Sequence, residues 1–86
     1  AASDVYKRQN LTSAYTMNEE DEKAVEAARQ AVVIDPDSGM ARNNLAVALY
    51  FSGDYSESKK NMEKARGLGY SVDPRFVQAL EEKLGD

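Results

Sequence analysis

The sequence contains no cysteine, no histidine and no tryptophan among its 86 residues. Without cysteine these residues can form no disulfide framework and no thiolate nucleophile. Without histidine they lack the usual acid/base group at neutral pH and the commonest metal ligand. No apolar run approaches the length of a membrane span. These absences exclude disulfide-stapled folds and chemistry that depends on Cys or His.

Positive charge is also scarce, since 11 Lys and Arg stand against 15 Asp and Glu, giving a net charge of -4. The basic residues are scattered along the chain, whereas a protein that follows a phosphate backbone gathers them on one surface. We therefore expect no nucleic acid and no membrane as a partner. A chain of this length forms one domain at most and buries a modest core.

The most informative stretch is residues 43–65, which is typical of two helices joined by a tight turn. Apolar residues at helical spacing line one face of the first helix, and Gly53 is placed to end that helix in the left-handed conformation. Asp54 can cap the next helix. The stripe of the first helix is Ala41, Leu45, Ala48 and Leu49, and the inner face of the second is Tyr55, Ser58, Met62 and Ala65.

A similar residue pattern occurs 34 residues upstream of this helical hairpin. The offset pairs Leu45 with Leu11 and Ala65 with Ala31. The period and the small-residue positions resemble the tetratricopeptide repeat family. The second repeat carries the pattern on Leu45, Ala46, Leu49, Gly53-Asp54-Tyr55, Ser58, Met62 and Ala65, and the first on Leu11, Thr12, Tyr15, Ala24, Ala28, Ala31 and Pro36. Departures are Arg8 and Arg42 where the family favours Trp, and Tyr70 where it favours Pro.

The resemblance implies an all-α fold of antiparallel helical hairpins, with two repeats and a C-terminal capping helix in a right-handed α–α superhelix. We expect repeat 1 at residues 10–38, repeat 2 at 39–72 and the capping helix at 73–86. Residues 1–9 resemble a translated sequencing adapter. We therefore expect native sequence from Asn10 and a C-terminal fragment of a longer array.

Local signals set the expected helix ends. The first helix should run from about Asp4 to Tyr15 or Met17, and acidic residues 19–22 should open the second, since carboxylates favour a helix N-terminus. A more specific interpretation of this acidic run is a calcium-binding loop. The alternating ligand spacing and the central Gly of such a loop are missing. The expected inner face of the second helix is Ala24, Ala28, Ala31 and Val32, before a stop at Pro36.

The next helix should be capped by Asp37 or Ser38, and the one after Gly53 should stop at Gly67 or Gly69. Asp73 with Pro74 predicts the start of the final helix, which we expect to reach about Leu84. Its apolar face is Phe76, Val77, Leu80 and Leu84.

In the family, the first helix of each hairpin lines a concave groove that binds peptide segments. The matching residues are Met40, Asn43, Val47, Tyr50 and Phe51, with Gln9, Ser13 and Thr16 on the first repeat. Exposed aromatic side chains tend to anchor partners. The alternative for Tyr50 and Phe51 is packing against the neighbouring hairpin or the capping helix. Asn44 is expected to be a buried hydrogen-bonding residue.

The resemblance therefore implies a non-enzymatic scaffold that binds a peptide or partner protein. We expect no catalytic, cofactor-binding or metal-binding residue, because every Asp and Glu falls at a helix start, a turn or an outer face. Two alternatives stay open: a C-terminal docking or regulatory region of a larger enzyme, and homodimerisation through the truncated N-terminal edge. Cytoplasmic and periplasmic locations both fit the sequence.

Overall fold

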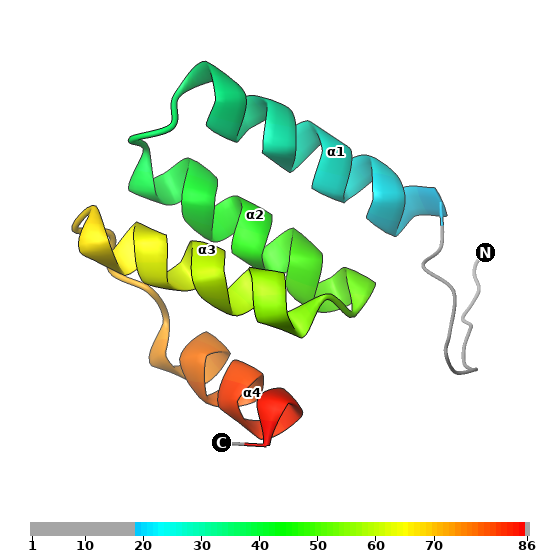
Figure 1. Ribbon diagram of the computed structural model, residues 1–86, viewed down its shortest axis with the longest axis vertical. Coiled ribbons are helices and arrows are strands. Elements are labelled where there is room, and N and C mark those ends of the chain that lie inside the picture. The colour runs from blue at the N-terminus through cyan, green and yellow to red at the C-terminus, as the bar shows by residue number, and fades with distance from the viewer. Residues whose placement is uncertain (1–18, 86) are drawn as a thin grey trace.

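Four helices lie side by side in the computed structural model, which describes residues 19–85 (Figure 1). They are α1 (Glu19–Ile34), α2 (Gly39–Ser52), α3 (Tyr55–Gly67) and α4 (Pro74–Leu84). Each helix runs antiparallel to the one before it (Figure 1). The described part of the chain has no strand, so the predicted all-α class and its helical hairpins are confirmed. The predicted first helix and the sites at Gln9, Ser13 and Thr16 lie outside the described residues.

The ends of the helices follow the local signals of the sequence. Gly53 closes α2 in the left-handed conformation at φ +92°, and the Asp54 carboxylate then accepts a hydrogen bond from the Glu57 N–H. Ser38 caps α2, and Asp73 caps α4 directly before Pro74. Past the end of α3, Gly69 is the glycine with positive φ. These caps satisfy N–H and C=O groups that a helix end leaves unpaired.

One core cluster fills the space between α1 and α2. It consists of Val25, Val32, Ala41, Leu45 and Leu49, with Ala28 and Ala48 packed against it. All but one of these residues belong to the expected inner faces of the two helices. Val25 adds a contact that the repeat pattern did not include.

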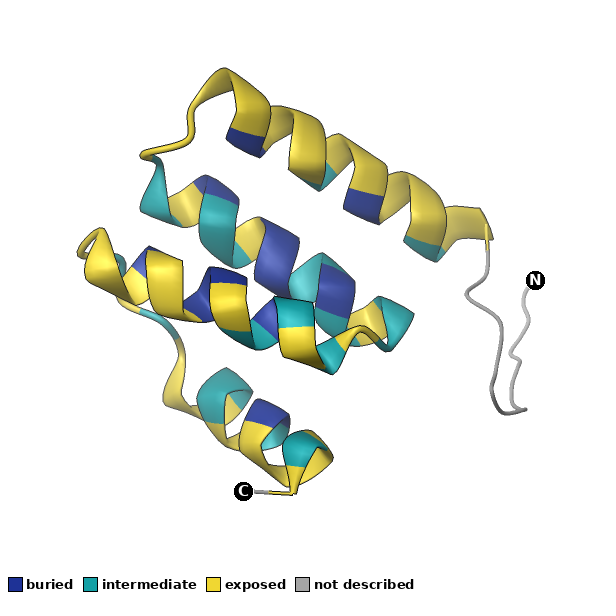
Figure 2. Ribbon diagram, in the orientation of Figure 1, coloured by how far each residue is buried: buried dark blue, intermediate teal, exposed yellow. Residues whose placement is uncertain are grey.

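The expected inner face of α1 needs one correction. Ala28 and Val32 face α2, but Ala24 and Ala31 are exposed (Figure 2). Val25 and Val32, seven residues apart, set the direction in which α1 meets α2, and this direction turns Ala24 and Ala31 away from the contact. The helix that was expected to cover this second side lies in the residues that the structure does not describe.

The second core cluster joins α2, α3 and α4 through Ala46, Met62 and Leu80, and small side chains lie beside it between α2 and α3. Ala46, Ser58 and Ala65 are fully buried, at 0% exposure, beside Met62 at 3% and Leu80 at 1%. The Ser58 hydroxyl donates a hydrogen bond to the carbonyl oxygen of Ala46 over 2.6 Å. Because no long side chain separates the two backbones here, α2 and α3 approach closely.

A glycine makes a second close approach at the start of α2. A Cβ added to Gly39 would lie 2.7 Å from the Cβ of Tyr70, which follows α3. Real Cβ atoms do not approach this closely, so a larger residue would push the start of α2 away from the end of α3. Small residues thus allow the hairpin of α2 and α3 to close tightly at the start of α2 as well as along the contact of Ala46 with Ser58.

An ion pair connects α1 directly to α3 across α2. The Arg29 guanidinium donates two hydrogen bonds to the Glu57 carboxylate, at 2.6 Å and 3.0 Å. The hydrogen bonds from Arg29 are the main reason that the pKa of Glu57 is lowered, and the same bonds raise the pKa of Arg29. Both side chains are partly exposed, at 47% for Arg29 and 35% for Glu57, so solvent screens the pair and limits its contribution to about 1 kcal/mol or less.

The Glu57 carboxylate should make stability depend on pH. A folded pKa below the unfolded value gives stability that is present above about 4.5 and is lost as pH falls through the folded pKa. We expect Glu57→Gln to lower the free energy of unfolding by up to about 1 kcal/mol near neutral pH and by much less in acid. Urea denaturation at both pH values measures this. Glu63→Gln is the control, and an equal loss from Glu57→Gln at both pH values would contradict the assignment.

We call the close contact of α2 and α3 at Ala46, Ser58 and Ala65 the seam. The seam should tolerate no larger side chain at Ala46. Ala46→Leu inserts a branched side chain where exposure is 0%, so we expect a loss of roughly 1–3 kcal/mol or more in unfolding free energy. Ala27→Leu on the exposed side of α1 is the matched control and should stay within about 0.5 kcal/mol. Thermal unfolding followed by circular dichroism compares them, and equal stability of the two variants would refute the close approach.

Candidate partner-binding surface

Two sides of α2 are occupied by neighbouring helices. The stripe of Ala41, Leu45, Ala48 and Leu49 packs on α1. Ala46 and Tyr50 belong to the cluster shared with α3 and α4. A helix with 3.6 residues per turn then has one remaining side. This side is where the predicted binding residues must be sought.

The remaining side carries residues spaced by three and four. We call Met40, Asn44, Val47 and Phe51 the outer stripe of α2. Met40 is 59% exposed and Phe51 is 64% exposed, while Val47 is half-buried. The stripe has no charged side chain, although 30% of the whole chain is charged. Arg42, the single charged residue of α2, points instead toward α3, where it hydrogen-bonds Asn61.

The two aromatic residues at the end of α2 have different roles. The Tyr50 ring meets the ring of Tyr55 at 5.4 Å and that of Phe76 at 5.7 Å, both edge to face. Phe51 contacts the Tyr50 ring at 5.4 Å and otherwise points outward. Packing against the capping helix was an alternative for both residues. The structure assigns that packing to Tyr50, and it leaves Phe51 open to a partner.

The two asparagines of α2 also differ from expectation. Asn44 was expected to be buried but is exposed, because it lies one turn after Met40 on the outer stripe. Asn43 is half-buried, and its side-chain oxygen is buried without a hydrogen-bond partner among the described residues. It precedes Ala46 and Tyr50 by three and seven residues, so it lies on the border between the outer stripe and the side that faces α3 and α4.

Of the predicted binding residues, Met40, Val47 and Phe51 thus share one surface, Asn43 lies at its border and Tyr50 lies beneath it. Sequence reasoning missed Asn44 as a member of the surface. Asn44 follows Met40 by four residues, and this spacing places both on the same side of a helix, so it could have predicted that Asn44 belongs to the surface. The outer stripe provides apolar contact area and side-chain amides, and it contains no titratable group. Its chemistry is suited to contact with another molecule.

Two further findings describe residues 19–85. None of the helices in this range has both the length and the apolar character needed to cross a membrane. No cluster of three or more acidic side chains within the range is placed to hold a metal ion. No protein-family model, curated protein or solved structure matches the chain.

The different roles of Tyr50 and Phe51 should appear in stability. Tyr50→Ala removes ring contacts to Tyr55 and Phe76, so we expect a loss of about 2 kcal/mol or more in unfolding free energy. Phe51→Ala should change it by about 0.5 kcal/mol or less, because the side chain is mostly exposed. Urea denaturation of the two variants tests this. A larger loss from Phe51→Ala than from Tyr50→Ala would reverse the assignment.

Proposed function

We propose that the chain is an interaction module of the tetratricopeptide repeat type, which binds a peptide or partner protein through the outer stripe of α2. The repeat period, the glycine turn and the small residues of the hairpin support the family. The observation that carries the function is the uncharged outer stripe, on which two large apolar side chains, Met40 and Phe51, are exposed on one side of one helix. Such a surface gains free energy when a partner covers it.

The roles within the surface follow from exposure. Phe51 and Met40 are the anchors, because a large exposed apolar side chain loses the most water contact on binding. Val47 lies between them on the same side of the helix. Asn44 and Asn43 supply amide groups that can pair with the backbone of a peptide. An apolar segment with a free backbone, in an extended or irregular conformation, is the complementary ligand.

Peptide display on the full chain, followed by binding measurements with a selected synthetic peptide, tests the proposal. We expect Phe51→Ala to weaken binding by about tenfold or more, which corresponds to about 1.4 kcal/mol. The matched control is Ile34→Ala, which removes an apolar side chain that is 83% exposed on another helix. This control should bind with nearly unchanged affinity.

Two outcomes would refute the proposal. One is a selected peptide whose affinity falls equally in Phe51→Ala and Ile34→Ala. The other is the absence of any selected peptide that binds saturably. Light scattering at the concentrations used separates peptide binding from self-association, because a dimer formed through the outer stripe would appear there without any peptide.

A further inference from the structure

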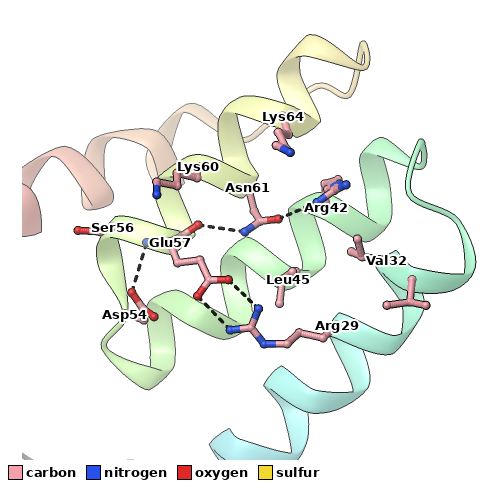
Figure 3. A pocket seen from close by; sticks show the side chains of 11 residues that line it. Arg29, Val32, Arg42, Leu45, Asp54, Ser56, Glu57, Lys60, Asn61 and Lys64 are labelled. Atoms are coloured by element: carbon pink, nitrogen blue, oxygen red, sulfur yellow. Dashed lines mark hydrogen bonds and ion pairs between the residues drawn. The ribbon is translucent and has the colours of Figure 1, made fainter.

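A hollow lies between α1 and α3 (Figure 3). It is on the side of α2 away from the outer stripe. Its volume is about 660 Å³. Leu45 and Val32 form its apolar floor, and the Arg29–Glu57 ion pair spans it near the turn that precedes α3. We call this hollow the α1–α3 cleft. Neither core cluster fills it.

The cleft is positively charged, in contrast to the whole chain. Four cationic and two acidic side chains line it, namely Arg29, Arg42, Lys60, Lys64, Asp54 and Glu57. Glu57 is paired with Arg29, and Asp54 is engaged at the start of α3 by the Glu57 N–H. Four positive and two negative side chains give the lining a net charge of +2, within a protein whose net charge is -4.

Arg42 is held in place before any ligand arrives. Its Nε donates a hydrogen bond to the Pro36 carbonyl oxygen over 3.2 Å, and its Nη1 donates one to the Asn61 Oδ1 over 3.4 Å. Asn61 is only 6% exposed and is itself fixed by donating to the Glu57 carbonyl oxygen over 3.0 Å. A guanidinium that is already oriented loses little side-chain entropy when an anion binds.

The two lysines complete a basic wall. Lys60 and Lys64 are four residues apart on α3, so they project from the same side of that helix. Figure 3 shows Lys64 and Arg42 approaching the cleft from α3 and α2, with Asn61 beneath them. The opposite wall, from α1, contributes Val32 and Val33, and Val33 is 78% exposed. The α3 wall thus carries two lysines, and the α1 wall is apolar apart from Arg29, which is paired with Glu57.

We propose that the α1–α3 cleft binds an acidic, amphipathic peptide segment, with carboxylates on Arg42, Lys60 and Lys64 and apolar side chains against Val32 and Val33. Charge complementarity selects this occupant, because the lining of the cleft carries a net charge of +2, which would repel a basic segment. The cleft and the outer stripe are separate surfaces of α2. This binding is therefore an addition to the proposed function and does not rest on it.

Fluorescence anisotropy with a labelled peptide of alternating Glu and Leu tests the assignment on the full chain. The double variant Lys60→Glu, Lys64→Glu should weaken binding by about tenfold or more, since both carboxylate contacts become repulsive. The matched control is Lys23→Glu, Lys83→Glu, which makes the same change in net charge outside the cleft. We expect it to weaken binding by about twofold or less.

Several results would overturn the proposal. Equal losses in the two double variants would mean that the peptide responds only to net charge. If a peptide with Ser in place of Leu bound as tightly as the Glu-Leu peptide, the apolar residues of the cleft would not contribute to binding. If a peptide with Lys in place of Glu bound as tightly, the basic residues would not contribute. Failure of the Glu-Leu peptide to bind saturably would also overturn it.

Two additional variants keep the test decisive. If circular dichroism shows that the charge reversal lowers helicity, the neutral variant Lys60→Gln, Lys64→Gln replaces it, and we expect a loss of about threefold or more. Phe51→Ala should leave the affinity for the Glu-Leu peptide unchanged. A loss of affinity in Phe51→Ala would place the acidic peptide on the outer stripe and refute the cleft, whatever the outcome for the proposed function.

Discussion

The close approach of α2 and α3 is the constraint on which the rest of the structure depends. Ala46, Ser58 and Ala65 have no exposed surface, and the hydrogen bond from the Ser58 hydroxyl to the Ala46 carbonyl joins the two backbones over 2.6 Å. Dispersion forces fall steeply with distance, so backbones this close gain contacts that larger side chains would prevent. The close contact fixes α2 and α3 relative to each other; α1 then packs on α2, and α4 packs mainly on α3.

The fixed position of α2 also decides which chemistry each surface can have. α2 carries one charged residue, Arg42, whereas α1 and α3 are rich in charged residues. The side of α2 away from its neighbours is therefore uncharged, while the cleft between α1 and α3 collects charged side chains from both walls. One helix thus separates an apolar surface from a basic one.

Local signals predicted the helix ends well, because a cap needs only a few adjacent residues. Gly53 with Asp54, and Asp73 with Pro74, contain all the chemistry that ends one helix or begins the next. Buried stripes were also predictable, since Leu45 and Leu49 fall at helical spacing. The turn residues and the seam together account for most of the fold.

What the sequence could not provide was the exact direction in which each helix meets its neighbours. Adjacent residues on a helix differ by about 100° in direction, and the sequence did not decide which of Asn43 and Asn44, or which of Tyr50 and Phe51, would face the neighbouring helices. The same uncertainty explains Ala24 and Ala31 on α1. The ion pair between Arg29 and Glu57 joins residues 28 apart, and no local spacing indicates such a pair.

The geometry of α2 has a consequence for how the two proposed surfaces act together. Arg42 and Leu45 on the cleft side precede Val47 by five and by two residues, so they point about 140° and about 160° away from it around the helix. Ligands on the two sides would not touch each other. Arg42 is tied to Pro36 and Asn61, and Leu45 is buried at 3%, so neither has room to move when the outer stripe is covered. Coupling between two binding sites requires an element with two arrangements that both ligands bias, and the contacts of Arg42 and Leu45 show one arrangement. The two surfaces should therefore bind their ligands independently, which is the behaviour of a scaffold that brings two partners together.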